Sequence, residues 1–100
     1  MSKELYPKQL ANYSDFCMRI GFKGKSEPEI DSILNDIISI FKIINSKLIF
    51  RIESEKKMSE RLIKGSSLSI NAEKLLISKL KQEMGVIFVS KMNEMINDWE

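Results

Sequence analysis

Three pairs of carboxylates come nearest to a catalytic arrangement in this sequence. They are Glu27 with Glu29, Glu53 with Glu55, and Asp98 with Glu100. General acid–base catalysis needs two carboxyl groups in a shared cleft, with pKa values that their surroundings push apart. All three pairs lie in polar stretches without a neighbouring nucleophile or base. We therefore interpret them as solvated surface charges, because charged side chains are rarely fully buried.

The lack of histidine removes most other catalytic and metal-binding chemistry. The sequence has a single cysteine, Cys17, and no histidine. Ser-His and Cys-His nucleophiles, zinc sites and an internal disulfide are therefore excluded. The Gly-Phe-Lys-Gly-Lys segment at 21–25 follows a predicted helix rather than a strand, which does not fit a phosphate-binding loop. We expect a protein that is not an enzyme and that has no cofactor and no metal.

A basic stretch is the strongest candidate for a binding surface. Between Lys47 and Lys64 there are six Lys or Arg residues and three Glu, a local excess of three positive charges. One hypothesis is a docking surface that attracts an acidic protein partner by electrostatic steering. Its contact residues would be Lys56, Lys57, Arg61 and Lys64. The simpler interpretation is a solvated helix face with intrahelical pairs such as Lys56 with Glu60.

A nucleic-acid binder that uses the same four residues is the third alternative. The net charge of the whole chain is only +2, and no aromatic platform or recognition-helix motif accompanies the basic residues. The composition therefore disfavours this alternative.

Length and composition fit one small soluble domain. The chain has 100 residues, of which 43% are hydrophobic and 30% charged. Its first ten residues carry charges and a proline, which does not fit a signal peptide, and no apolar run reaches the ~20 residues needed to cross a bilayer. We expect a cytoplasmic or nuclear protein.

Apolar residues at helical spacing predict an all-α fold of about five helices, packed as an antiparallel bundle. The predicted helices cover about 7–20, 27–44, 47–64, 70–84 and 88–99. The second has the clearest start, because Ser26 and Glu29 have the spacing of a capping box with Pro28 in the first turn. Ser69 or Asn71 is expected to cap the fourth.

Two predicted helices carry features that bear on the core. In the first, Leu10, Tyr13, Cys17 and Ile20 recur three and four residues apart and are expected to share one buried face. In the third, residues 53–57 contain no apolar side chain, although Glu53 should point toward the face that Ile49 and Phe50 bury.

Several blocks of the sequence resemble cullins, the scaffold subunits of multisubunit ubiquitin ligases. The resemblance is strongest at 61–74 (RLIKGSSLSINAEK), 77–85 (ISKLKQEMG) and 88–92 (FVSKM), and looser at 10–15 and 26–41. These blocks are collinear and cover nearly the whole chain. The resemblance implies that residues 1–22 correspond to the end of the N-terminal repeat stalk, and residues 26–100 to the start of the C-terminal four-helix bundle.

The resemblance also implies a partner class and limits to function. Cullins have a basic groove near this bundle that attracts the acidic tail of a ubiquitin-conjugating enzyme. Lys56 and Arg61 match its pattern, whereas Glu55 and Glu60 stand where the family has lysines. The family regions that bind substrate adaptors and the RING subunit, and the modified lysine, have no counterpart in these blocks.

Other departures from the cullin pattern fall in the predicted core. The family has a Phe-Tyr pair at Glu53 and Ser54, a cysteine at Met84, and an acidic pair at 70–71. Losing two core aromatics would cost several kcal/mol, since one Phe→Ala substitution costs about 3–5 kcal/mol. An alternative to a working scaffold segment is therefore a truncated, functionally silent relic. Self-association through an uncovered apolar face is also compatible with the sequence.

Overall fold

A computed structural model describes residues 5–99 of the chain, the side chain of Leu5 excepted, and within that range it contains helices and no strands. The elements in chain order are α1 (Leu5–Phe16), a π-helical turn η1 (Cys17–Gly21), α2 (Glu27–Phe41), α3 (Lys47–Lys64), α4 (Ile70–Met84) and α5 (Val86–Trp99). The predicted all-α class is confirmed. The third helix has the predicted bounds, and the fifth begins two residues earlier than expected, directly after Gly85.

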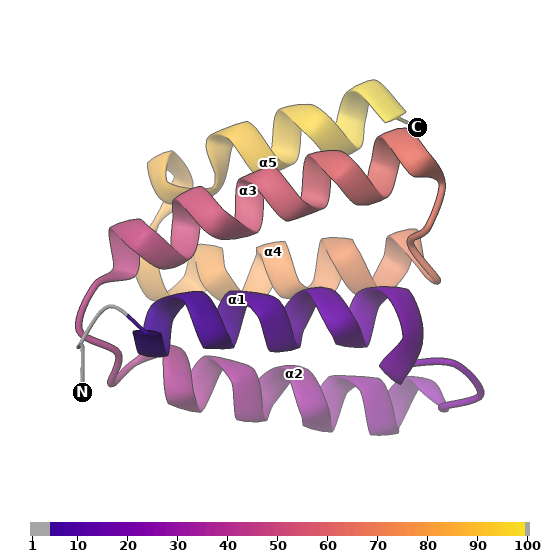
Figure 1. Cartoon of the computed structure of the whole chain (residues 1–100), viewed down its shortest axis with the longest axis horizontal. Helices are drawn as coiled ribbons and strands as arrows, with labels where there is room; N and C mark the ends of the chain where they lie inside the picture. The colour runs from indigo at the N-terminus through magenta and orange to yellow at the C-terminus, as the bar shows by residue number, and fades with distance from the viewer. Residues whose placement is uncertain (1–4, 100) are drawn as a thin grey trace.

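Helices that follow one another in the chain run in opposite directions (Figure 1). As a result α1, α3 and α5 all point one way, and α2 and α4 point the other. The closest packing joins α1 to α3, α4 to α5, α2 to α4, α3 to α5, and α1 to α2. Helices that are consecutive in the chain are therefore antiparallel, whereas α1 and α3, and α3 and α5, pack side by side in parallel. The last residues of α1, α3 and α5 lie at the same end of the bundle, near Lys64 (Figure 1).

Serine hydroxyls cap three of the helices. Ser26 Oγ accepts a hydrogen bond from the Glu29 backbone N–H at 3.3 Å, and the Glu29 carboxylate accepts one from the Ser26 backbone N–H at 3.1 Å. Ser46 caps α3 and Ser69 caps α4 in the same way, each accepting from the backbone N–H three residues later at 3.1 Å. The predicted capping box is thus confirmed, and Ser69 rather than Asn71 caps α4.

The buried face of the first helix differs from the prediction. Leu10 and Cys17 are buried, but Tyr13 is 48% exposed and Ile20 is 50% exposed. Small residues, Ala11 and Ser14, occupy the buried stripe instead. The prediction relied on large hydrophobic side chains at helical spacing. Because α1 packs closely on α3, small side chains fit better at their contact.

One hydrophobic core holds side chains from all five helices. At its centre the ring of Phe41 packs edge-on against Phe50 and Phe88, with ring centroids 5.0 and 5.8 Å away. The side chains of α1 belong to this same core, and the assignment of 1–22 and 26–100 to two parts of a larger scaffold stays a prediction. No helix within the described range is long and apolar enough to cross a membrane.

Candidate interaction surface

Helix α3 carries all four basic residues predicted to contact a partner, but its geometry separates them. Lys57, Arg61 and Lys64 are spaced by four and three residues, which places them on one face of the helix. Lys56 precedes Lys57 by one residue and is therefore turned by about 100° around the helix axis. The structure brings the first three together and directs Lys56 elsewhere.

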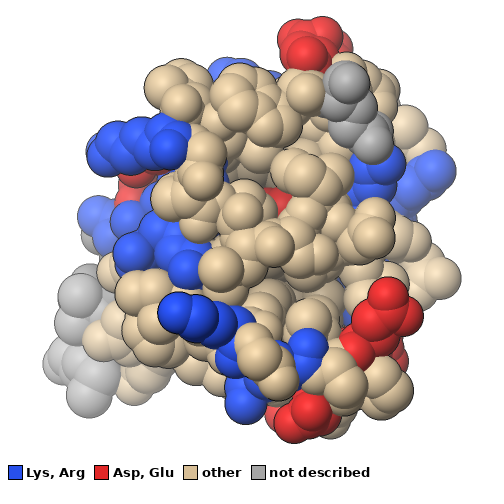
Figure 2. Space-filling view, turned by 90° about the vertical axis from the view of Figure 1, so that its right-hand side faces the viewer, with Lys and Arg blue, Asp and Glu red and all other residues tan. Residues whose placement is uncertain are grey.

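The three grouped residues border a hollow of about 270 Å³ at the end of the bundle. Asp15 and Arg19, from α1 and η1, complete its wall together with Glu60 and Ser66. In the view onto this end of the molecule, Lys and Arg side chains gather along one side (Figure 2). The hollow is mixed in charge, because two carboxylates share its wall with four cations.

Lys56 borders a different groove, of about 510 Å³, between α3 and α5. Its wall contains Ile52, Glu55 and Ser59 from α3, and Lys91 and Met95 from α5. Glu60 lies on the border of both depressions. A partner that touches Lys56 and Lys57 together would therefore have to cross the ridge of α3.

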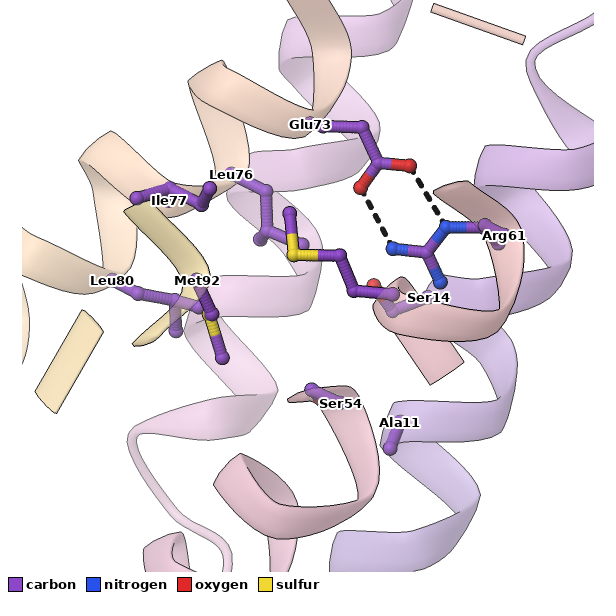
Figure 3. Close-up of a pocket in the computed structure, with 10 residues that line it drawn as sticks. Ala11, Ser14, Ser54, Arg61, Glu73, Leu76, Ile77, Leu80 and Met92 are labelled. Atoms are coloured by element: carbon purple, nitrogen blue, oxygen red, sulfur yellow. Dashed lines mark hydrogen bonds and ion pairs between the residues drawn. The ribbon is translucent and has the colours of Figure 1, made fainter. Parts of the chain in front are cut away.

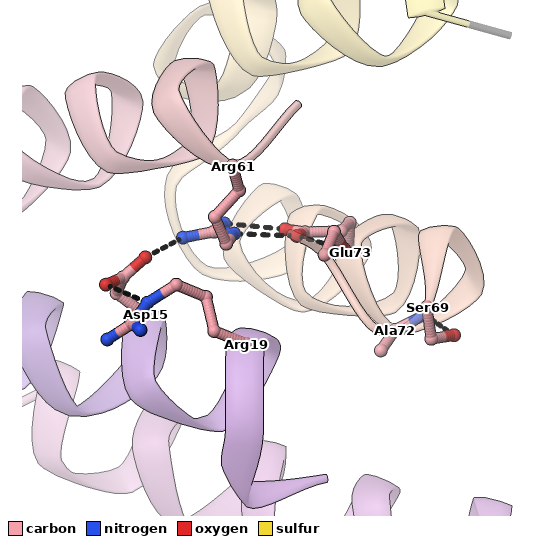
Figure 4. Close-up of polar contacts among 7 residues, drawn as sticks. Asp15, Arg19, Arg61, Ser69, Ala72 and Glu73 are labelled. Carbon is pink, nitrogen blue, oxygen red and sulfur yellow. Dashed lines mark hydrogen bonds and ion pairs between the residues drawn. The ribbon is translucent and has the colours of Figure 1, made fainter. Parts of the chain in front are cut away.

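Arg61 is buried, which corrects its predicted place on an open surface. Only 5% of the residue is exposed. Its Nε and Nη2 donate to Oε2 and Oε1 of Glu73 at 2.8 and 2.7 Å, and its Nη1 donates to Oδ1 of Asp15 at 2.8 Å (Figure 4). The physical reason is that two carboxylates from other helices satisfy the guanidinium, so the charge can lie inside the protein.

Further polar contacts complete this network. Ser67 Oγ donates to Glu73 Oε2 at 2.8 Å, and Arg19 Nε donates to Asp15 Oδ2 at 2.9 Å. Glu73 is only 1% exposed. One buried arginine thus ties together α1, the end of α3 and the start of α4.

The network shifts the pKa values of two of its members. Burial alone would lower the pKa of Arg61, but the hydrogen bonds and charges of Glu73 and then Asp15 outweigh burial and raise it. For Asp15, burial favours a higher pKa, and the hydrogen bonds from Arg61 and Arg19 reverse this and lower it. Both groups therefore stay charged near neutral pH.

Sequence reasoning missed Asp15, Arg19 and Glu73. A signal for Glu73 existed, since an acid at this position interrupts the apolar side of α4 between Ala72 and Leu76. Nothing local could have paired Asp15 with Arg61, because the two are 46 residues apart.

Two of the carboxylates in the predicted pairs have structural partners among the residues described. Glu29 belongs to the capping box, where hydrogen bonds from Ser26 lower its pKa. The Oε2 atom of Glu55 lies 3.9 Å from the Nε atom of Arg51, which is one turn earlier in α3. Glu100 is outside the described range. Between residues 5 and 99, no cluster of three His, Cys, Asp or Glu residues could hold a metal ion.

Comparison with known proteins gives consistent matches along the chain. Residues 2–100 match the family model described as the cullin alpha solenoid domain. The chain is 38% identical to Cullin-4 of Dictyostelium discoideum over 99% of its length, 37% identical to mouse Cullin-4A over 91%, and 40% identical to Cullin-2 of Caenorhabditis elegans over 91%. In each case the chain spans 12% of the relative's length.

Proposed function

The chain belongs to the cullin family, and on that premise we propose that it is a non-catalytic helical scaffold segment that contributes protein–protein contacts to a ubiquitin ligase. The observation that supports this proposal is the collinear match over residues 2–100 to a helical family domain. The packing agrees with such a role, because α1, α3 and α4 are fastened together by charged hydrogen bonds around Arg61.

The proposed partner surface is the hollow at the end of the bundle. Arg19, Lys57 and Lys64 are its available cations, and the partner class is an acidic peptide segment such as the tail of a ubiquitin-conjugating enzyme. Arg61 contributes by holding Asp15 and Glu73 in place, not by direct contact. Binding should be weak and salt-sensitive, because Asp15 and Glu60 line the same hollow.

A titration with a fluorescent acidic peptide tests this surface. The wild-type chain should bind at low ionic strength and lose affinity as salt is added. The double variant K57E/K64E should bind more weakly, mainly through slower association. The control is K8E/K81E, which makes the same change in net charge at two exposed lysines that border neither the hollow nor the groove beside Lys56. Equal losses in both variants would mean that the peptide responds only to net charge.

A pulldown with a purified RING subunit tests the proposed extent of the scaffold. The cullin resemblance places the RING-binding region outside these residues, so no stoichiometric complex is expected. Robust binding would contradict the assignment of 26–100 to the start of the C-terminal bundle.

A functionally silent relic is the second candidate, and one observation favours it. In the middle of α3 the hydroxyl of Ser54 is shielded from solvent without a hydrogen-bond partner among the described residues. Such a group weakens a core. Far-UV circular dichroism with a thermal melt separates the candidates, since a scaffold segment that folds alone should unfold cooperatively, and a relic should show helix without a cooperative transition or no helix.

A further inference from the structure

A small cavity lies inside the bundle where α1, α3, α4 and α5 meet (Figure 3). Its volume is about 20 Å³. Most of its wall is apolar and includes Met58 and Leu80, but four polar or charged residues also line it: Ser14, Ser54, Arg61 and Glu73. The cavity therefore combines an apolar enclosure with several groups that can form hydrogen bonds.

Two buried side-chain polar atoms among the described residues have no hydrogen-bond partner, Arg51 Nε and Ser54 Oγ, and of these two residues Ser54 lines the cavity. Its Oγ atom is shielded from solvent and forms no hydrogen bond with any described residue. A serine hydroxyl can donate one hydrogen bond and accept two. Because buried polar groups are nearly always paired with protein or with ordered water, this hydroxyl calls for a partner.

The size of the cavity restricts what that partner can be. About 10–15 Å³ is enough for one water molecule, provided that the wall offers two to four polar partners. A cavity of about 20 Å³ meets this size, but it is too small for an organic ligand. Ser14, on α1, is 4% exposed and lies on the same wall, so a second hydroxyl is available from the neighbouring helix.

We propose that this cavity binds one ordered water molecule, which hydrogen-bonds to the Ser54 hydroxyl and to a second polar group on the wall. The water joins the middle of α3 to α1 at a point where no direct polar contact does so. The ion pair of Arg61 with Glu73 lines another part of the same cavity (Figure 3).

A crystal structure of the full chain at high resolution is the direct test. We expect a density peak in the cavity within hydrogen-bond distance of Ser54 Oγ and of one further polar atom. An empty cavity would overturn the proposal. A Ser54 hydroxyl that donates to the backbone carbonyl of Phe50, one turn earlier, would also overturn it, since serine in helices often bonds in that way.

Water-to-protein nuclear Overhauser effects provide a test in solution. The methyl groups of Met58 and Ala11, both on the cavity wall, should show a long-lived water contact in the wild type. Ser54→Val, which fills space and removes the hydroxyl, should abolish it. Ser32→Ala changes an exposed serine on α2 and should leave it intact. A contact that persists unchanged in Ser54→Val would refute the site.

Discussion

Arg61 and Glu73 form a two-point ion pair between the last turn of α3 and the first turn of α4. Both carboxylate oxygens of Glu73 accept from the guanidinium, at 2.7 and 2.8 Å, and both residues are almost fully buried. The pair therefore fixes the angle between two helices that only five residues, 65–69, connect.

Breaking this pair on one side should destabilise the protein strongly. We expect Glu73→Leu and Arg61→Met each to cost about 3–5 kcal/mol of unfolding free energy, because each deprives a buried charge of its two-point partner. The double variant Arg61→Met with Glu73→Leu should be much closer to the wild type, since no unpaired charge is left between these two positions and Asp15 keeps Arg19. Urea unfolding near neutral pH measures all four proteins. Additive losses in the double variant would contradict this account.

Stability should fall in acid partly through Asp15. Its pKa is lower in the folded protein than its ordinary value of 3.8, because Arg61 and Arg19 stabilise the carboxylate. A folded pKa below the unfolded one means that the unfolded state binds more protons. The contribution is therefore complete above about pH 4 and is lost as the pH falls through the folded value.

Asp15→Asn should remove this part of the pH dependence. The melting temperature of the variant should be lower than that of the wild type near neutral pH, and the difference should narrow below about pH 4. Glu29, whose pKa is also lowered, is unchanged in the variant and accounts for part of the slope that remains. Two melting profiles that stay parallel across the acid range would show that Asp15 has no such role.

The capping box of α2 should have a measurable but smaller effect. Ser26→Ala removes the acceptor for the Glu29 backbone N–H and should cost about 1 kcal/mol. Ser32 is exposed to solvent and lies in the same helix, away from its ends. Ser32→Ala should therefore be neutral or slightly stabilising, since alanine has the higher helix propensity. Chemical denaturation of both variants isolates the cap from general effects of losing a serine.

Features that depend on neighbouring residues were predicted well from the sequence. The start of α2 follows from Ser26 and Glu29, three residues apart, and the bounds of α3 follow from Ser46 and from Gly65, whose φ of 66° suits glycine just past a helix end. The cullin relationship depended on collinear blocks and is confirmed by the family match.

The burial of Arg61 could not be predicted in this way. Its partners lie 12 and 46 residues away in the chain, and only the packing of α1 and α4 against α3 brings them together. Without those partners an arginine in a basic stretch is properly interpreted as a surface residue. The acidic-partner surface therefore stays a prediction for Lys56, Lys57, Arg61 and Lys64, and the burial of Arg61 leaves it little surface for direct contact.

The substitution of Ser54 gives the sharpest test of the core of α3. The cullin resemblance implies an aromatic residue at this position, and its loss is expected to cost several kcal/mol. The cavity beside Ser54 is nevertheless only about 20 Å³, room for about one water molecule, so the surrounding side chains already fill most of the site. We therefore expect Ser54→Tyr to destabilise the protein by about 1–3 kcal/mol through overpacking.

Glu53→Phe is the matched control, because Glu53 is half-buried on the same turn and does not line the cavity. It should change the unfolding free energy by less than Ser54→Tyr does. Thermal and urea unfolding of both variants give the comparison. If Ser54→Tyr instead increased the unfolding free energy by several kcal/mol, the neighbouring side chains would have to move apart easily to accept the ring. The expectation that overpacking destabilises this variant would then be wrong.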